Sequence, residues 1–325
     1  MNEPTPADDR ETLLMVNGFS PYVDALLGTR FQIQRLDQAP GRMQLLARIG
    51  PQVRAVIAGA SVGFPADLWD VLPALEVIAI HGVGTDKVDL ARARQRGVKV
   101  FTTPDILSED VADLAIGMWI ALSRRVADAD RYVREGHWSA APFALTRRVT
   151  GQRVGILGLG RIGLAIARRA DPFAATIAYT SRHPVPGVAY PYEADCMALA
   201  RRSDVLFVAL PGGAATDAMV NADVLAALGS SGLLVNIARG SVVDEAALIS
   251  ALREGKLGGA ALDVFRNEPN LEPAFAELDN VLLQPHQGSA TAETRYRMVE
   301  HMADQLNGYF ADTSTAGSRS RNGVS

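Results

Sequence analysis

The sequence has almost no cysteine, no long hydrophobic run and no surplus of basic residues. Cys196 is the single cysteine in 325 residues, which excludes an internal disulfide and a cysteine-based zinc cluster. No apolar run approaches the roughly 20 residues that a membrane-spanning helix needs. The net charge of -4 argues against nucleic acid as the main partner, because neutralising phosphates requires a basic surface. We therefore expect no metal site, no membrane contact and no nucleic-acid partner.

The beginning of the chain bears on the location of the protein. Residues 1–10 are polar and acidic, which is unlike a secretory leader. We expect a cytoplasmic protein.

Short apolar runs alternate with helical patterns along the chain. In the first hundred residues, strand-like runs occur at Leu13–Val16, Val53–Ile57, Leu75–Ile80 and Val98–Phe101, with helical patterns at Tyr22–Leu27, Pro65–Leu72 and Leu90–Arg96. Such alternation is typical of a parallel sheet that is covered on both faces. Pro104 then breaks the pattern, and a long amphipathic stretch follows from Ser108 to Glu135.

A second α/β region follows that stretch. Six strand-like runs lie at Val154–Leu157, Thr176–Tyr179, Val205–Ala209, Leu233–Asn236, Ala260–Leu262 and Val281–Leu283, and a helical pattern follows at Ala292–Phe310. Six strands with intervening helices are typical of a doubly wound nucleotide domain. The fold class is therefore α/β with two doubly wound parallel-sheet domains.

The most informative motif is Gly158-Leu-Gly160-Arg-Ile-Gly163, which lies between a strand-like run and a helix. In a dinucleotide site the first glycine allows a tight turn, the second lets backbone approach a pyrophosphate, and the third lets the helix pack on the strand. The first turn of the helix then offers free N–H groups to the phosphates. This context predicts a dinucleotide site at residues 158–163.

The end of the second strand indicates which dinucleotide binds. NAD-binding domains carry an acidic residue there, but no Asp or Glu occurs between Asp171 and Glu193. Thr180 occupies that position, and Ser181 and Arg182 follow it. A hydroxyl and a guanidinium attract a 2′-phosphate, which a carboxylate would repel. The sequence therefore favours NADP(H).

Polar residues follow three strands of this domain: Arg239, Glu268 and His286. Ligands of open α/β sheets bind outside the carboxyl ends of the strands, so these side chains are candidates for one site. Among the five histidines, His286 is the best candidate for a proton donor, and His81 beside a glycine turn is a candidate substrate contact.

Four ordered motifs resemble the D-isomer-specific 2-hydroxyacid dehydrogenases. They are Gly158-Leu-Gly-Arg-Ile-Gly163, Asn236-Ile-Ala-Arg-Gly240, Leu262-Asp-Val-Phe-Arg-Asn-Glu-Pro269 and Pro285-His-Gln-Gly-Ser-Ala-Thr291. Within that family the sequence is most similar to the NADP-preferring glyoxylate/hydroxypyruvate reductases and the hydroxyphenylpyruvate reductases.

The resemblance implies a Rossmann nucleotide domain inserted into a flavodoxin-like substrate domain. We place the first part of the substrate domain at residues 1–103, the NADP-binding domain at 104–287, a returning helix at 288–311 and a disordered tail at 312–325.

The resemblance also implies an activity, the NADPH-dependent reduction of small 2-oxo acids. Arg239 would hold the carboxylate and carbonyl oxygens, and His286 would donate a proton to the developing alkoxide. Glu268 would hydrogen-bond the other ring nitrogen of His286, and the N–H groups of Val83 and Gly84 would bind the substrate carboxylate. The implied cofactor contacts are Gly158, Leu159, Gly160, Arg161, Ile162, Gly163, Ser181, Arg182, Leu210, Pro211, Thr216, Ile237, Ala238, Arg239, Asp263, which would bind the nicotinamide amide, His286 and Gly288.

The resemblance also implies a homodimer that forms through the long interdomain helix region. In such a dimer a tryptophan near the end of that helix region can reach the neighbouring active site. Trp138 is the matching residue here, with a buried packing role as the alternative.

Two other functions remain open. Some transcriptional co-repressors resemble this family, but they carry long extra tails, whereas the tail here is short. A formate or phosphite dehydrogenase would normally use NAD, which residues 180–182 disfavour. Glyoxylate, hydroxypyruvate and arylpyruvates all remain candidate substrates, with residues 59–64 expected to line the side-chain pocket.

Overall fold

The structure is a computed structural model that describes residues 10–18 and 20–321, and it divides into two compact units. The chain passes from unit 1 to unit 2 between Leu107 and Ser108, and it returns to unit 1 at Ala292. Both boundaries lie four residues beyond the expected positions at 103/104 and 287/288. One reason is that Thr291 Oγ1 lies 2.5 Å from Asp110 Oδ2, which ties the segment after His286 to unit 2.

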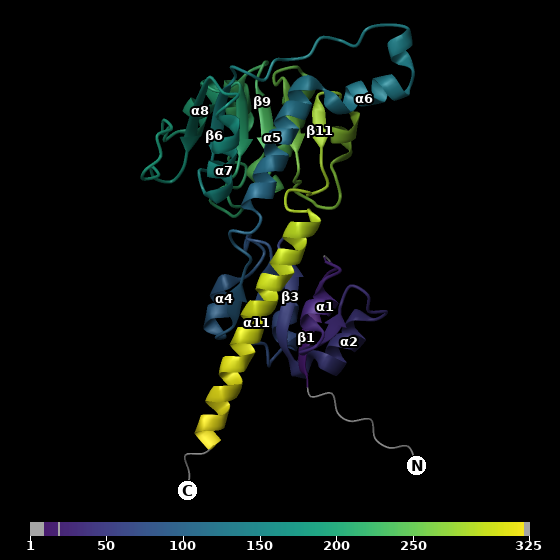
Figure 1. The fold of residues 1–325 in the computed structure, drawn as a ribbon, viewed down its shortest axis with the longest axis vertical. Coiled ribbons are helices and arrows are strands. Elements are labelled where there is room, and N and C mark those ends of the chain that lie inside the picture. Colours follow the sequence, from purple (N-terminus) through teal and green to yellow (C-terminus); the bar gives the residue numbers. More distant parts are fainter. Residues whose placement is uncertain (1–9, 19, 322–325) are drawn as a thin grey trace. The chain divides into compact units, whose positions relative to one another are not determined.

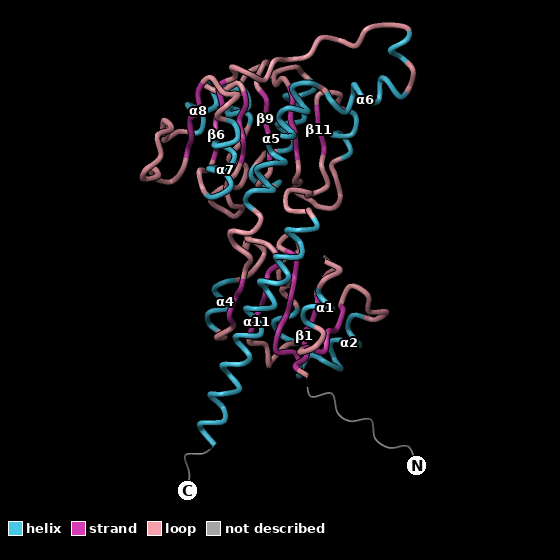
Figure 2. Tube along the Cα trace, viewed as in Figure 1, coloured by secondary structure: helices cyan, strands magenta, loops and turns pink. Residues whose placement is uncertain are grey.

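Unit 1 contains a parallel sheet with helices on both faces (Figures 1 and 2). Within the described residues its strands are β1 (Glu11–Met15), β2 (Phe31–Arg35), β3 (Val53–Gly59), β4 (Val77–His81) and β5 (Lys99–Phe101), in the order β2-β1-β3-β4-β5. One face carries α2 (Arg42–Ile49), α3 (Leu68–Val71) and α4 (Leu90–Gln95), and the other carries α1 (Val23–Leu27) and α11 (Ala292–Arg321). This strand order is the flavodoxin-like one.

Strand β2 and helix α2 are absent from the sequence-based prediction. The β2 sequence Phe-Gln-Ile-Gln-Arg alternates apolar and polar residues, and only Phe31 is fully buried. Because β2 is an edge strand that pairs with β1 alone, it lacks the continuous apolar run of a central strand.

Unit 2, residues 108–291, contains a second parallel sheet. Its strands are β6 (Arg153–Leu157), β7 (Thr176–Thr180), β8 (Val205–Val208), β9 (Leu233–Asn236), β10 (Gly259–Leu262) and β11 (Val281–Leu283), in the order β11-β10-β9-β8-β6-β7. All six runs expected from the sequence form strands, so the prediction of two parallel α/β domains is confirmed.

Two helical layers cover the sheet of unit 2. On one side α5 (Ser108–Arg124) packs against α7 (Arg161–Ala170), β9 and β10. On the other side α8 (Cys196–Arg201), α9 (Ala222–Leu228) and α10 (Glu245–Arg253) enclose a large apolar cluster. The sheet is thus buried on both faces, as its apolar strands require.

The long amphipathic stretch is two helices rather than one. Arg125 adopts a left-handed φ of 48°, which ends α5 and starts α6 (Val126–Arg134) in a new direction. No residue of α6 is buried. In Figure 1, α6 and the loop that follows it project away from the body of unit 2. We call residues 126–148 the arm.

The expectation of a disordered tail from Asp312 is wrong for most of that segment. Helix α11 continues to Arg321, and residues 322–325 lie outside the described part of the chain. Since no proline occurs between Ala292 and Arg321, nothing interrupts the helix once its packed part has formed.

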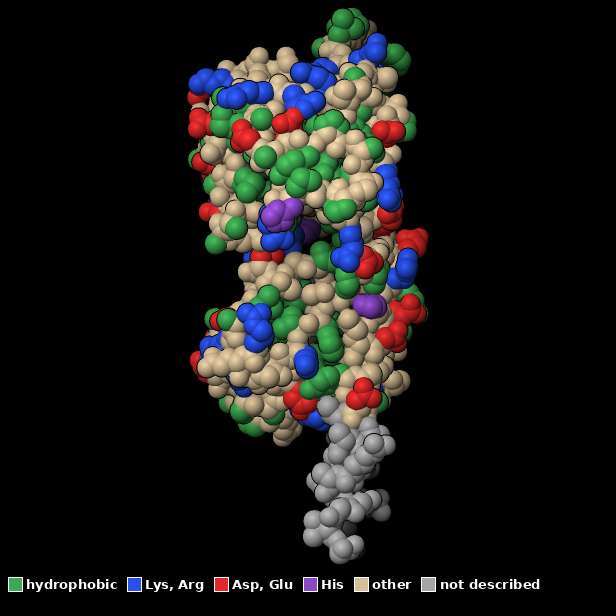
Figure 3. All heavy atoms as spheres, turned by 90° about the vertical axis from the view of Figure 1, so that its left-hand side faces the viewer, with side chains coloured by type: hydrophobic (Ala, Val, Ile, Leu, Met, Phe, Trp, Pro, Cys, Tyr) green, Lys and Arg blue, Asp and Glu red, His purple; other side chains and the backbone are tan. Residues whose placement is uncertain are grey.

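Two surface properties bear on function. Among the described residues, no helix is long and apolar enough to cross a bilayer. On the face shown in Figure 3, acidic and basic side chains of the described residues are intermingled over both units.

Candidate active site

The glycine turn between β6 and α7 has the geometry expected of a dinucleotide site. Gly158 has a left-handed φ of 101°, and a Cβ on Gly163 would lie 2.0 Å from the carbonyl oxygen of Gly158. At Gly160, in contrast, a Cβ would meet nothing within 4 Å. Gly160 is extended and precedes α7 without a side-chain cap, so the space beside Gly160 at the start of α7 is open. This is where a pyrophosphate can accept hydrogen bonds from backbone N–H groups.

The segment after β7 carries a hydroxyl and a guanidinium beside this turn. Gly158 N donates to Thr180 O at 2.8 Å, which places the end of β7 next to the glycine turn. Ser181 Oγ lies 2.5 Å from the carbonyl oxygen of His183 and so fixes the loop. Arg182 is exposed, and no ion-pair partner for it is found in residues 10–18 and 20–321. Its guanidinium is available to an anion.

The other expected cofactor contacts lie at the carboxyl ends of β8 and β9. Leu210 and Pro211 follow β8, and Thr216 Oγ1 donates to the carbonyl oxygen of Pro211 at 2.7 Å. Ile237 and Ala238 follow β9 and are buried. Both segments therefore lie at the same edge of the sheet as the glycine turn, because all strands are parallel.

His286 and Glu268 form the central pair of the site. His286 Nδ1 lies 2.7 Å from Glu268 Oε2, and Glu268 Oε1 accepts a hydrogen bond from the Phe265 N–H at 2.9 Å. The carboxylate therefore requires a proton on Nδ1 and orients the ring. The side chain of His286 is about one-third exposed and that of Glu268 less so, which leaves Nε2 as the nitrogen available to a substrate.

Arg239 is placed by the turn that follows β9. Asn236 Oδ1 accepts from the Ala238 N–H, and Asn236 Nδ2 donates to the Arg239 carbonyl, both at 3.1 Å. A Cβ on Gly240 would lie 2.0 Å from the carbonyl carbon of Phe265, so this turn touches the loop that carries Glu268. The sequence therefore brings Arg239, Glu268 and His286 to one edge of three adjacent strands.

Asp263 holds the segment that follows His286. Its two carboxylate oxygens accept the N–H groups of Gln287 at 2.6 Å and Gly288 at 2.9 Å. Asp263 is buried, and this burial raises the pKa of its carboxyl despite the two hydrogen bonds. Asp263 thus fixes the backbone position of His286, which has a left-handed φ of 56°. Contact with a nicotinamide amide remains a prediction.

The loop that the family resemblance implicates in carboxylate binding belongs to unit 1. Gly82 is fixed by Thr103, whose Oγ1 accepts from the Gly82 N–H at 3.1 Å and whose N–H donates to the Gly82 carbonyl at 2.9 Å. Within the described part of the chain, the N–H groups of Val83 and Gly84 donate no hydrogen bond. Two neighbouring backbone donors are therefore available at the carboxyl end of β4.

Sequence reasoning missed several residues that hold these groups in place. Asn236, Gly240 and Thr103 take no part in the proposed chemistry themselves. The roles of Gly240 and Thr103 depend on contacts with segments that are distant in sequence, whereas Asn236 bonds within its own turn. Asn236 and Gly240 lie in a motif that the sequence analysis singled out, and an Asn followed by a turn is a recognisable local signal.

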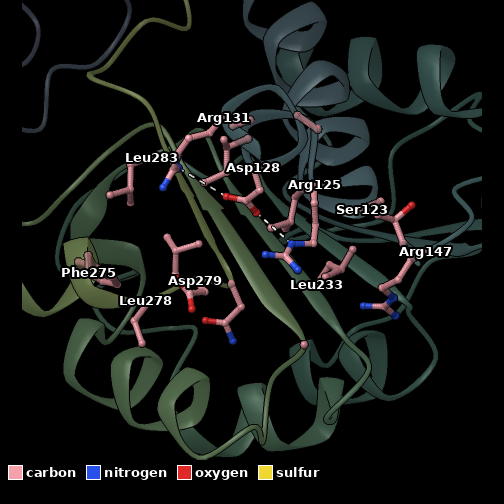
Figure 4. A pocket seen from close by; sticks show the side chains of 18 of the residues that line it. Ser123, Arg125, Asp128, Arg131, Arg147, Leu233, Phe275, Leu278, Asp279 and Leu283 are labelled. Atoms are coloured by element: carbon pink, nitrogen blue, oxygen red, sulfur yellow. Dashed lines mark hydrogen bonds and ion pairs between the residues drawn. The ribbon is translucent and has the colours of Figure 1, made fainter. Parts of the chain in front are cut away.

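A groove lies beside the arm in unit 2 (Figure 4). Its volume is about 650 Å³, and it is lined by residues of α5, α6, β11 and the loop before β11. Asp128 pairs there with Arg125 at 2.9 Å and with Arg131 at 3.5 Å. Trp138 on the arm is 68% exposed, so the alternative that it is a buried packing residue is wrong for the single chain.

Comparison with known proteins gives a consistent result. The family model described as "D-isomer specific 2-hydroxyacid dehydrogenase, NAD binding domain" matches residues 116–288. The chain is 46% identical over 302 residues to a glyoxylate/hydroxypyruvate reductase of Arabidopsis thaliana, covering 93% of this chain and 96% of that protein. It is 45% identical over 299 residues to a hydroxyphenylpyruvate reductase of Plectranthus scutellarioides, covering 92% and 96%.

A solved structure is also similar. The NADPH-dependent glyoxylate/hydroxypyruvate reductase of Sinorhizobium meliloti, in complex with NADP and malonate, is 41% identical with a TM-score of 0.88. The match covers 93% of this chain and 94% of that one. Similarity in sequence and in fold therefore extends over both units.

Proposed function

The chain belongs to the D-isomer specific 2-hydroxyacid dehydrogenase family, and we propose that it reduces small 2-oxo acids to D-2-hydroxy acids with NADPH. The observation that carries this proposal is the His286–Glu268 pair at the same sheet edge as Arg239 and the glycine turn. Glyoxylate and hydroxypyruvate are the proposed substrates, since relatives over 40% identical bear those names.

The residues of the site suit the reduction of a carbonyl next to a carboxylate. Arg239 offers a planar fork of donors to the carboxylate and carbonyl oxygens, which orients the substrate and polarises the carbonyl. His286 donates a proton from Nε2 to the carbonyl oxygen as negative charge develops there. Glu268 keeps the ring oriented through Nδ1 and stabilises its charged form. NADPH, when bound, supplies the hydride.

We propose that the carboxylate also binds to the N–H groups of Val83 and Gly84, which donate no other hydrogen bond among the described residues. Two neighbouring backbone donors suit one carboxylate, because each N–H can point at a separate oxygen. Val62, in the neighbouring loop of unit 1, is partly exposed and is a candidate contact for the substrate side chain.

The preference for NADPH is supported by residues 180–182. The exposed Arg182 has no carboxylate partner in the described part of the chain, and no acidic residue ends β7. An Arg182→Ala variant should raise the KM for NADPH about tenfold, the equivalent of one charge-assisted contact, and leave the KM for NADH nearly unchanged. Exposed Arg201 on α8, replaced by alanine, is the control. Equal effects on both cofactors would contradict this assignment.

We further propose a homodimer in which the arm of one chain contacts the groove of the other. The arm exposes Val133, Trp138 and Leu145, and Leu145 also lines the groove. A surface that combines a projecting apolar segment with a groove beside it is self-complementary, as a two-fold interface requires. Trp138 is the candidate for contact with the neighbouring active site.

The decisive experiment follows NADPH and NADH absorbance with a panel of 2-oxo acids. Glyoxylate, hydroxypyruvate and hydroxyphenylpyruvate would each be tested with both cofactors. Turnover of the small acids with NADPH is the expected result. Turnover of hydroxyphenylpyruvate alone would favour the arylpyruvate alternative, and no turnover of any acid would favour a nucleotide-sensing co-repressor-like protein.

A further inference from the structure

A buried polar pair lies at the carboxyl end of β4 in unit 1. Residues 77, 79 and 81 of β4 point to the face that α11 covers, where Val77 and Ala79 pack with Val299 and Met302. His81 continues this row along the strand, and Arg295 continues it one helical turn before Val299. Arg295 Nη1 lies 3.2 Å from His81 Nδ1. The apolar contact between α11 and β4 therefore ends in an arginine–histidine pair.

The geometry determines which atom carries the proton. A guanidinium can only donate, so His81 Nδ1 must accept, and the ring must be in the neutral form with its proton on Nε2. This agrees with the surroundings, because burial and the Arg295 charge lower the pKa of His81 to about 4. The neutral ring therefore accepts a hydrogen bond from the guanidinium but does not balance its positive charge.

The charge of Arg295 is not balanced by a carboxylate. Its side chain is half-buried, and this burial lowers the pKa of the guanidinium. Among residues 10–18 and 20–312, no Asp or Glu forms an ion pair with it. Arg54, also half-buried in unit 1, is paired with both Glu11 and Glu76. A half-buried cation without a carboxylate partner carries a desolvation cost, and an anion from outside the chain would offset that cost.

The backbone next to this pair supplies the other half of such a site. His81 is followed directly by Gly82, whose N–H and carbonyl are both bound to Thr103, and then by the Val83 and Gly84 donors. In an open α/β sheet, ligands bind at the carboxyl ends of the strands. The uncompensated cation and the two donors therefore lie at the same end of β4.

We propose that Arg295, held through His81, is a positioning residue for the substrate carboxylate. It keeps the imidazole at the end of β4 in one tautomer and orientation, and it supplies positive charge beside the loop that binds the anion. This inference rests on the proposed function, because the anion in question is the carboxylate of the 2-oxo acid. The role is distinct from the chemistry of His286, so it concerns binding of substrate rather than turnover.

The test compares Arg295→Met with Arg297→Met in the full-length protein. Arg297 is exposed on the same helix, and no polar partner for it is found in the described residues, which makes it a matched control. Arg295→Met should raise the KM for glyoxylate about tenfold or more, with kcat within about threefold and the affinity for NADPH unchanged. The inhibition constant of oxalate, a carboxylate that is not reduced, should rise by the same factor. Arg297→Met should change none of these quantities.

Two further measurements separate positioning from a general loss of structure. Added guanidinium ion should lower the KM of Arg295→Ala, whereas it cannot restore a distorted fold. His81→Asn keeps an acceptor close to the Nδ1 position and should retain most of the substrate affinity, whereas His81→Leu removes it and should resemble Arg295→Met.

The outcomes distinguish the two proposals. If the unmodified protein reduces no 2-oxo acid, the proposed function fails. If it does reduce glyoxylate and Arg295→Met behaves like Arg297→Met, the inference about Arg295 is wrong while the function stands. A fall in kcat with an unchanged KM would also overturn it.

Discussion

Two carboxylates of the same loop region, Asp263 and Glu268, have different tasks. Asp263 accepts backbone N–H groups with both oxygens, so its charge fixes the chain after β11. Glu268 uses one oxygen for the Phe265 N–H and the other for the His286 ring. Loss of Asp263 should therefore affect the position of His286, whereas loss of the Glu268 charge should affect proton transfer from His286.

Glu268→Gln tests the second of these roles. The amide preserves the shape of the side chain and removes the negative charge that stabilises a charged imidazole. We expect kcat for glyoxylate to fall roughly 10–100-fold with a small change in KM, and His286→Ala to fall at least as far. Glu277→Gln, at an exposed glutamate that pairs with Arg253, should leave kcat unchanged. Near-normal turnover of His286→Ala would remove His286 from the role of acid.

The lowered pKa of His81 predicts that the protein loses stability in acid. Its pKa is lowered to about 4 in the folded chain by burial and by the Arg295 charge, whereas a histidine in an unfolded chain has a pKa of about 6.5. Between these two values the unfolded chain binds a proton that the folded chain does not, so the free energy of unfolding falls as the pH falls. Across the whole window the loss is about 3 kcal/mol.

The measurement is urea unfolding at pH 7.5 and pH 4.5. His81→Asn should lower stability at pH 7.5, and its deficit relative to the unmodified protein should shrink at pH 4.5. Replacing exposed His183 with glutamine should give a pH dependence like that of the unmodified protein. Identical pH dependence in all three proteins would show that His81 is not the group responsible.

At the scale of elements, the β6–α7 turn contains one glycine that folding requires and another that cofactor binding requires. A Cβ at Gly163 would lie 2.0 Å from the Gly158 carbonyl oxygen, whereas a Cβ at Gly160 would enter open space. Gly163→Ala should therefore destabilise the protein by roughly 1–3 kcal/mol. Gly160→Ala should fold normally but raise the KM for NADPH about tenfold, because the methyl group would occupy the space needed by the pyrophosphate.

Thermal unfolding and cofactor titration of both variants check this prediction. Gly117→Ala in the middle of α5, where a Cβ would also meet nothing within 4 Å, should stabilise the protein by about 0.5–1 kcal/mol without affecting the cofactor. If Gly160→Ala lowers the unfolding temperature as much as Gly163→Ala, the separation of roles is wrong.

Some of the helices and strands could be predicted from the sequence, and others could not. The six strands of unit 2 are short apolar runs buried on both faces, so each was visible locally, and the residues that follow them were placed at one edge by the parallel topology alone. Edge strand β2 has no such run. The break at Arg125 rests on one left-handed residue that is not glycine, and no sequence pattern marks it.

Contacts between distant segments escaped prediction for a related reason. His81 and Arg295 are 214 residues apart, and only the return of α11 to β4 brings them together. Gly240 belongs to a motif that is visible in the sequence. Only the close approach of Phe265, however, explains why the residue at this position has no side chain. Side chains that carry chemistry were thus predictable from the sequence, while the residues that position them required the packed structure.

At the scale of the whole molecule, the arm predicts the state of association. Leu145 is fully exposed in the single chain and lines the groove, and Val133 is 53% exposed on α6.

Sedimentation equilibrium should give twice the chain mass of 34.7 kDa. Leu145→Asp and Val133→Asp together should give the monomer mass with an unchanged far-ultraviolet spectrum, since neither side chain contributes to a core. Met43→Asp, at an exposed apolar residue of α2, should remain dimeric. A monomeric unmodified protein, or a dimer that survives both arm substitutions, would show that the arm and groove do not form the interface.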